Sequence, residues 1–223
     1  MKREIVLTED GSSSLYVEEI QEHFHSHFGA IQEAQHIFIQ NGFCEELKSE
    51  PDQISILEIG FGTGLNCFLT ILESIKDKTQ VYYEGIEKFP LSEAEYKQLN
   101  YASVHDPHQQ YLFDKLHELP WEVPVTILPN FKLCKRECSF ETTIFDANRF
   151  DVVYFDPFSP DKQPEMWEFS VIKKVYDSMK NSAILMTYCT KGVVKRTFKE
   201  VGFKIEKLPG PIGKREILRA TKV

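Results

Sequence analysis

Residues 54–66 read ISILEIGFGTGLN, and this stretch decides the fold that the sequence predicts. The apolar run 55–59 is typical of a buried strand with a tight turn behind it. Apolar side chains then recur at the spacing of an amphipathic helix, at Leu65, Phe68, Leu69, Leu72 and Ile75. Strand, glycine turn and helix form the first half of a nucleotide-binding βαβ unit.

The positions of the glycines indicate which nucleotide the turn holds. A dinucleotide fingerprint, G-x-G-x-x-G, needs glycine at position 65, which is Leu65 here. The observed pattern is G-x-G-x-G, formed by Gly60, Gly62 and Gly64, with Glu58 two residues before it. A carboxylate beside the turn gains nothing from a pyrophosphate, but it attracts a ligand that carries an ammonium and a sulfonium. The turn therefore favours S-adenosylmethionine over NAD.

The next predicted strand, 81–86, ends at a second acid, Glu87. An acid at this place in a βαβ unit accepts hydrogen bonds from the ribose hydroxyls of the nucleotide. Taken singly, the G-x-G-x-G pattern could be a simple turn, and Glu87 could be a solvated strand end. Their occurrence in this order supports a cofactor site.

The composition suits a single globular domain, because 223 residues with 42% hydrophobic side chains can bury a sizeable core. We predict an N-terminal extension over 1–50 that packs on the active-site crevice, and a Rossmann-like domain over 51–223. The boundary is expected in the polar segment 45–53. No apolar run reaches the length of a membrane span, and the N-terminus lacks the apolar core of a signal peptide. A cytoplasmic protein is therefore expected.

Cysteine and histidine patterns bear on metal binding. The five cysteines are scattered and form no C-x-x-C pair, so neither a disulfide framework nor a zinc site is expected. His23, His25 and His27 alternate, and on a strand they would share one face. No cysteine or carboxylate pattern completes a metal site around them. Lining a pocket mouth is the preferred interpretation, with plain surface histidines as the alternative.

Charge is unevenly distributed along the chain. The formal net charge is −8, yet residues 173–223 carry 13 Lys and Arg against 4 Asp and Glu, a net +9. A basic region on an acidic protein can hold a phosphate backbone locally while the remainder repels non-specific binding. Ordinary helix and strand surface is the alternative explanation.

The remaining elements follow the order of an α/β fold. Short strands are predicted at 5–7 and 15–19, and a helix over 30–40 closed by Asn41 and Gly42 as a C-cap. Ser92 and Glu95 have capping-box spacing and begin another helix. Later strands are expected at 131–137, 151–155, 183–188, 203–208 and 216–220, and helices at 165–180 and 192–201. This order predicts a class I methyltransferase fold, a mostly parallel sheet with a C-terminal antiparallel hairpin.

A second functional stretch, DPFSPDKQPEMW, follows the predicted strand 151–155. Asp156 stands at the carboxyl end of a central parallel strand, where such sheets bind ligands. Prolines restrict the loop, and Phe158 is an apolar side chain in a polar turn. Methyltransferases that act on exocyclic nitrogens use a similar order of acid, proline and aromatic residue. The match is partial, because Phe158 occupies the place of their second proline.

Several segments together resemble one family, the MnmD-like methyltransferases that convert 5-aminomethyl-2-thiouridine to its methylaminomethyl form in tRNA wobble-uridine modification. The segments are LEIGFGTGLN (57–66), EKFPL (87–91), YFDPFSPDKQPEMW (154–167), TYCTKG (187–192) and LPGPIGKREILRA (208–220). The N-terminal HSHFGAIQEAQHIFIQNG also looks like this family. In many bacteria the domain is fused to a FAD-dependent oxidase, but this sequence has no second glycine fingerprint. The resemblance therefore implies a stand-alone methyltransferase, with the oxidase step either absent or supplied by a separate upstream partner.

The resemblance implies roles for individual residues. Asp156 is the expected catalytic group, which accepts from the amine and orients its lone pair. S-adenosylmethionine is expected to contact Glu58, Gly60, Gly62, Gly64, Asn66 and Glu87. Glu33 is expected to close the cofactor pocket, with a solvated helix face as its alternative. The adenine contact stays open among Glu137, Ser139 and Glu141.

On the substrate side, Phe158 is the candidate to stack on the flipped-out wobble base, and a loop anchor in the core is its alternative. The edge of the crevice is expected to carry Tyr188 and three phosphate contacts, Lys191, Lys214 and Arg215. The partner is therefore tRNA, and neither a membrane nor a metal is expected.

Two other functions use some of the same features. An aminopropyltransferase of the spermidine synthase type shares the glycine turn and an amine substrate. It would need a pair of aspartates, and the loop offers Asp156 and only a distant Asp161. A catalytically silent partner of tRNA or of the oxidase is disfavoured by the intact acids Glu58, Glu87 and Asp156.

Overall fold

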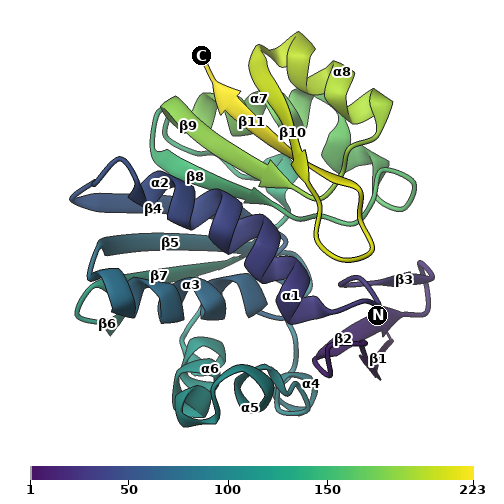
Figure 1. Ribbon diagram of the computed structural model, residues 1–223, viewed down its shortest axis with the longest axis vertical. Helices are drawn as coiled ribbons and strands as arrows, with labels where there is room; N and C mark the ends of the chain where they lie inside the picture. The colour runs from purple at the N-terminus through teal and green to yellow at the C-terminus, as the bar shows by residue number, and fades with distance from the viewer. Residues whose placement is uncertain (1) are drawn as a thin grey trace.

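The computed structural model describes residues 2–223, and its main element is an eight-stranded mixed sheet (Figure 1). The strand order is β10-β11-β9-β8-β4-β5-β7-β6. The four pairings between β4, β5, β7, β8 and β9 are parallel, and those of β6, β10 and β11 are antiparallel. The strand bounds are β4 Gln53–Ile59, β5 Gln80–Glu87, β6 Val125–Leu128, β7 Phe131–Glu137, β8 Phe150–Phe155, β9 Met179–Thr187, β10 Phe203–Pro209 and β11 Glu216–Lys222. This arrangement confirms the predicted class I fold.

Helices cover both faces of the sheet because β4 is apolar on both sides. Ile54 and Ile56 pack into the core beneath α3, whereas Leu57 and Ile59 pack into the core beneath α7 and α8. Fully buried parallel strands read as continuous apolar runs for this reason. The helices are α3 Leu65–Asp77, α4 Glu93–Tyr96, α5 Tyr101–His105, η2 Pro107–Gln109, α6 Gln110–Glu118, η3 Phe140–Thr142, η4 Pro164–Trp167, α7 Phe169–Ser178 and α8 Gly192–Val201.

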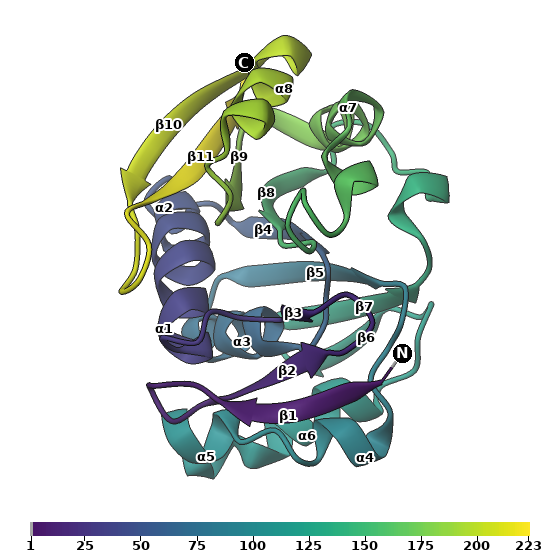
Figure 2. The same cartoon turned by 90° about the vertical axis from the view of Figure 1, so that its right-hand side faces the viewer.

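The N-terminal strands form a separate three-stranded sheet of β1 Arg3–Leu7, β2 Ser13–Val17 and β3 Glu22–His23 (Figure 2). It is attached to the segment that follows β5. The Ser13 N–H donates to Asn100 Oδ1 at 2.7 Å, and Arg3 pairs with Glu95 at 3.2 Å. Glu95 also completes the predicted capping box with Ser92, which is confirmed.

The predicted C-cap at Asn41 and Gly42 is wrong. The helix continues from α1 Ala30–Ala34 through η1 Gln35–Phe43, a π-helical stretch, into α2 Cys44–Leu47. Gly42 is instead a packing residue, since a Cβ there would lie 3.2 Å from Met186 Cγ and 3.3 Å from a ring carbon of Tyr154. Burial against the sheet therefore overrides the local stop signal. The division of the chain at residue 50 stays a prediction.

The predicted helix 165–180 is also wrong at both ends. Pro164–Trp167 is a 3₁₀ turn, and α7 ends at Ser178 because the backbone N–H groups of Asn148 and Arg149 donate to carbonyls of its last turn. Met179 then begins β9, paired with Phe150. The helix 192–201 and the final hairpin are confirmed.

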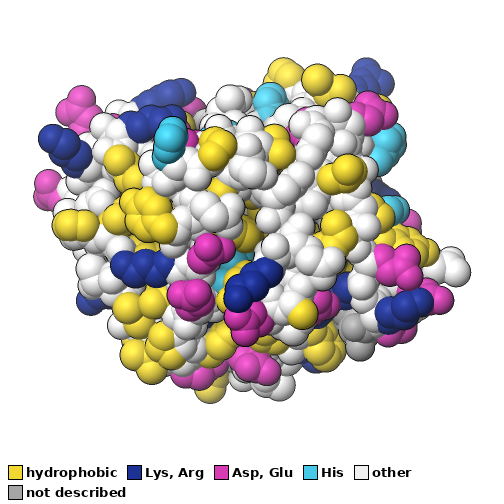
Figure 3. Space-filling model, turned by 90° about the horizontal axis from the view of Figure 1, so that it is seen from below, with side chains coloured by type: hydrophobic (Ala, Val, Ile, Leu, Met, Phe, Trp, Pro, Cys, Tyr) yellow, Lys and Arg dark blue, Asp and Glu magenta, His cyan; other side chains and the backbone are white. Residues whose placement is uncertain are grey.

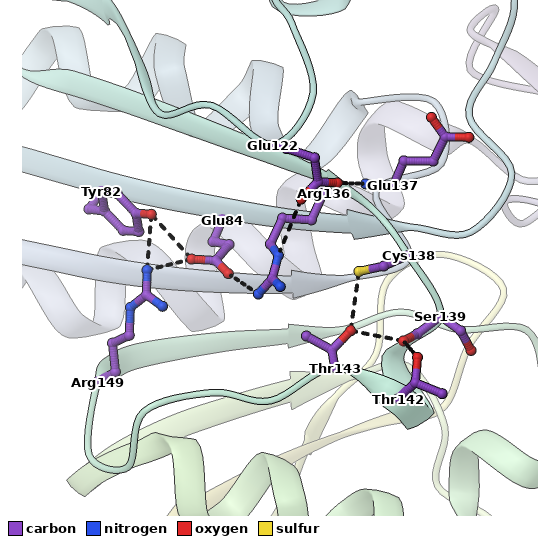
Figure 4. A network of polar contacts seen from close by, with 10 residues as sticks. All are labelled: Tyr82, Glu84, Glu122, Arg136, Glu137, Cys138, Ser139, Thr142, Thr143 and Arg149. Atoms are coloured by element: carbon purple, nitrogen blue, oxygen red, sulfur yellow. Dashed lines mark hydrogen bonds and ion pairs between the residues drawn. The ribbon is translucent and has the colours of Figure 1, made fainter.

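A buried ion-pair network ties β5 and β7 to the segment before β8 (Figure 4). The Glu84 side chain is only 2% exposed and pairs with Arg136 at 3.1 Å and with Arg149 at 2.5 Å. The Arg149 guanidinium also lies 5.2 Å from the ring centroid of Tyr82. A buried carboxylate needs such paired and hydrogen-bonded cations. The network therefore anchors the region from which residues 138–141 extend.

Among residues 2–223, no helix is long and apolar enough to cross a membrane.

Candidate active site

A cavity of about 370 Å³ opens at the carboxyl ends of β4, β5 and β8, where α/β sheets bind ligands. Its floor begins at the glycine turn. Gly60 has φ +91°, and a Cβ on it would lie 2.6 Å from the Asp156 carbonyl oxygen. A side chain is excluded there, because the turn passes directly against the start of the Asp156 loop. The two functional stretches of the sequence thus meet at this point.

Glu87 stands at one wall of the cavity, at the end of β5. Its carboxylate accepts from the Gly62 N–H at 2.9 Å and from the Phe89 N–H at 2.8 Å. These bonds fix the carboxylate beside the glycine turn, as binding of a ribose requires. Three residues are candidates for the adenine contact. Glu141 lines this wall, whereas Glu137 and Ser139 do not.

Glu58 lies under the cavity rather than in its wall. The side chain is fully buried, accepts from Tyr83 Oη at 2.8 Å and accepts from Asn66 Nδ2 at 2.9 Å. Asn66 Nδ2 is also 3.2 Å from Asp156 Oδ2, so the amide bridges two carboxyl groups. Burial raises the pKa of Glu58 well above its ordinary value, although Tyr83 and Asn66 oppose the shift.

Asp156 lies at the end of β8 among further charged groups. Burial and the nearby Glu33 carboxylate raise the pKa of Asp156 well above its ordinary value, whereas Asn66 and Lys214 oppose the shift. Lys214 Nζ pairs with Glu33 Oε1 at 2.7 Å and lies 4.9 Å from the ring centroid of Tyr188. Glu33 and Lys214 come from opposite ends of the chain, so the fold brings an N-terminal helix and the C-terminal hairpin together over Asp156.

Phe158 is held at the cavity by its own loop. Its N–H donates to Gln163 Oε1 at 3.1 Å, and its carbonyl accepts from Trp167 Nε1 at 2.8 Å. Its ring meets Phe24 edge to face at 5.3 Å between centroids. The loop therefore presents a partly exposed aromatic face beside Asp156.

The structure brings together most of the residues predicted for the site, but not all. Those that line the cavity are Glu33, Gly60, Gly62, Asn66, Glu87, Asp156, Phe158, Tyr188 and Lys214. Glu58 and Gly64 lie behind the wall, and a Cβ on Gly64 would meet Leu116 at 2.8 Å. Lys191 pairs with Asp161 at the surface, and Arg215 is exposed outside the cavity.

The alternating histidines do not share a strand face. β3 ends at His23, and His25 lies beyond it, partly buried, with Nδ1 3.1 Å from Ser14 Oγ. Burial lowers the pKa of His25 to about 4. His23 and His25 line the cavity, as the pocket-mouth interpretation predicted, whereas His27 is exposed and does not. Within residues 2–223, no group of three or more metal-ligating side chains could hold a metal ion.

Some cavity residues have no sequence signal of their own. Phe24, Ser26, Cys138 and Phe140 reach the cavity only through the tertiary fold. Residues 138–141 follow β7, so their place at the carboxyl edge of the sheet follows from the parallel pairing of β5 with β7. For Phe24 and Ser26, the signal in the sequence is the histidine-rich segment 23–27 in which they lie.

The distribution of basic side chains bears on where a phosphate backbone could bind. On the face seen from below, Lys and Arg side chains are dispersed among acidic and hydrophobic ones (Figure 3). That face therefore offers no continuous basic patch for a phosphate backbone.

The cavity suits S-adenosylmethionine. Gly60 and Gly62 line it at the turn that follows β4, and Glu87 stands at the end of the second strand of the βαβ unit. Asn66 Oδ1 is buried and has no hydrogen-bond partner within residues 2–223, so an N–H of a ligand would satisfy it. The Glu87 carboxylate in the wall suits a positively charged cofactor.

Comparisons with known proteins agree with this site. Residues 130–223 match the family model of an S-adenosyl-L-methionine-dependent methyltransferase. The tRNA 5-methylaminomethyl-2-thiouridine biosynthesis bifunctional protein MnmC of Campylobacter fetus subsp. fetus is 34% identical over 75% of this chain and 28% of that protein. The chain thus spans less than a third of that relative's length.

Solved structures extend the comparison. The crystal structure of MnmC2 from Aquifex aeolicus superposes with a TM-score of 0.82 at 25% identity, over 100% of this chain and 70% of that one. Spermidine synthase from Thermotoga maritima has a TM-score of 0.54 at 12% identity, over 95% of this chain and 69% of that one, and shares the fold alone. The chain belongs to a family of S-adenosyl-L-methionine-dependent methyltransferases related to the bifunctional MnmC proteins.

Proposed function

We propose that this protein N-methylates the aminomethyl group of 5-aminomethyl-2-thiouridine at the wobble position of tRNA. The single observation that supports this most is the Asp156 carboxylate at the end of β8, between the glycine turn and Phe158 in one cavity. The MnmC relatives are named for the biosynthesis of 5-methylaminomethyl-2-thiouridine in tRNA, which would be the product of this step. The amine itself would be formed by a separate FAD-dependent oxidase.

The residues divide the work between the two ligands. Gly60, Gly62 and Glu87 would hold S-adenosylmethionine, which supplies an electrophilic methyl group on its sulfonium. Phe158 would stack on the wobble base and place its aminomethyl group beside Asp156. Tyr188 supports the loop because its hydroxyl donates to the Pro157 carbonyl at 2.9 Å.

Asp156 would act on the amine. Its carboxylate accepts an N–H and directs the nitrogen lone pair toward the methyl group. It takes up the proton that the nitrogen loses when the new N–C bond forms and the methyl–sulfur bond breaks, which leaves a neutral thioether. Lys191 and Arg215, outside the cavity, remain the candidates for phosphate contacts.

The test is methyl transfer from radiolabelled S-adenosylmethionine to tRNA that carries the aminomethyl nucleoside. We expect label in the nucleoside with wild type and at least about a hundredfold less with Asp156→Ala. Cofactor affinity, measured by calorimetry, should be similar in both. Label that enters putrescine or another small amine, but not tRNA, would contradict the assignment. Asp161 pairs with Lys191 outside the cavity and so does not supply the second aspartate of an aminopropyltransferase.

A further inference from the structure

A chain of hydrogen bonds leads from the interior of the sheet to the reacting carboxylate. Tyr83 Oη donates to Glu58 Oε2 at 2.8 Å, and Asn66 Nδ2 donates to Glu58 Oε1 at 2.9 Å. The same Nδ2 donates to Asp156 Oδ2 at 3.2 Å. Tyr83 lies on β5, Glu58 on β4 and Asn66 in the first turn of α3, so three rigid elements hold the chain in place.

The two inner members of the chain have no access to a ligand. Tyr83 and Glu58 are both fully buried, and neither lines the cavity. Their influence on the reaction must therefore pass through Asn66, which does line it.

The chemistry of an amide explains what the inner members do. Asn66 can present either its NH₂ or its oxygen, and the oxygen would repel a carboxylate. Glu58 Oε1 accepts from Asn66, and Tyr83 fixes the Glu58 carboxyl group from its other side. The NH₂ group is thereby kept between Glu58 and Asp156, and Oδ1 is left for another donor.

We propose that Tyr83 and Glu58 are positioning residues, which act through Asn66 to hold the Asp156 carboxylate in its reactive orientation. This inference rests on the proposed function for the identity of the reaction, and it changes the role predicted for Glu58 from a cofactor contact to a support of Asp156. In this chain Tyr83 donates to Glu58, and Asn66 donates to both Glu58 and Asp156.

The decisive variant is Tyr83→Phe, because it removes one hydroxyl outside the cavity. Tyr154→Phe is a matched control: Tyr154 is also a fully buried tyrosine, on β8 at the other side of β4, and its hydroxyl lies 3.2 Å from Thr70 Oγ1 on α3, the helix of Asn66. We expect Tyr83→Phe to lower kcat about fivefold, with the affinity for S-adenosylmethionine changed less than about threefold. Tyr154→Phe should retain the wild-type kcat.

Two further measurements do not depend on turnover. Because the hydrogen bond from Asn66 favours the ionised form of Asp156, loosening it in Tyr83→Phe should move the carboxyl titration of Asp156, followed by ¹³C NMR, to higher pH. Tyr154→Phe should leave that titration unchanged. Glu58→Gln should bind S-adenosylmethionine within about threefold of wild type, because Glu58 does not touch the cavity.

The outcomes separate the two proposals. A wild-type protein that fails to methylate tRNA would end the proposed function, while the Asp156 titration would still decide the positioning role. An unchanged titration in Tyr83→Phe, or equal shifts in Tyr83→Phe and Tyr154→Phe, would overturn the positioning role. So would a loss of cofactor binding of more than tenfold in Glu58→Gln, which would make Glu58 a direct ligand.

Discussion

Two buried glutamates on neighbouring strands show how one sheet serves both stability and chemistry. Glu58 on β4 and Glu84 on β5 occupy adjacent registers, since Glu84 pairs with Leu57 and Glu58 with Gly85. They point to opposite faces. Glu84 is compensated by Arg136 and Arg149, whereas Glu58 has only the neutral donors Tyr83 and Asn66.

The two glutamates differ in whether a positive charge compensates the buried carboxyl group. A carboxylate that is paired with two arginines anchors structure and needs no ligand. Glu58 receives hydrogen bonds only from neutral donors and lies close to Asp156. Its pKa is therefore raised, and its protonation state depends on the groups around it. Asn66, which donates to Glu58, lines the cavity, whereas Arg136 and Arg149 do not.

The largest effect is expected from Glu84→Gln, which leaves both arginines without their carboxylate. We expect the free energy of unfolding to fall by about 3 kcal/mol, the lower end of the range for broken buried pairs, because the arginines are partly exposed. Urea unfolding at pH 7 measures it. Glu73→Gln, which removes a surface ion pair with Lys76, is the control and should cost less than about 0.5 kcal/mol. Equal losses of stability in Glu84→Gln and Glu73→Gln would contradict the anchoring role of Glu84.

A smaller effect on stability is expected from Glu58→Gln, below about 1 kcal/mol at pH 7, since only neutral donors surround the carboxyl group. The pH dependence is the sharper test. Because the folded-state pKa of Glu58 is raised, its contribution is fully present below its ordinary pKa and is lost as the pH rises through the raised value. The stability of wild type relative to Glu58→Gln should therefore decline from pH 5 to pH 8. A constant difference would mean that Glu58 is as well compensated as Glu84.

The smallest effect is expected from Lys214→Gln, which removes a charge beside Asp156. Lys214 opposes the rise in the pKa of Asp156, so its removal should raise that pKa further and move the acid limb of kcat to higher pH. We expect about fivefold lower kcat at pH 6 and nearly wild-type kcat at pH 9. Lys191→Gln, which loses the same charge outside the cavity, should leave the limb unmoved. A parallel loss at all pH values in Lys214→Gln would instead indicate a positioning defect.

The predictable part of the fold is local. The βαβ unit, the helix 192–201 and the capping box at Ser92 follow from periodicity and end signals within a few residues. The failures at Gly42 and Met179 share a cause: tertiary packing outweighed a local helix-stop signal at Gly42, and strand pairing outweighed a local helix signal at Met179.

The sequence by itself determined the doubly covered parallel sheet, its glycine turn and the acids at the strand ends, since apolar pattern and strand order dictate where those ends lie. Only the tertiary structure decided which acids face the cavity. It buried Glu58 beneath Asn66, and it joined Glu33 to Lys214 over Asp156. The physical reason is that side-chain contacts, burial and the pKa of a carboxyl group depend on neighbours that are distant in sequence.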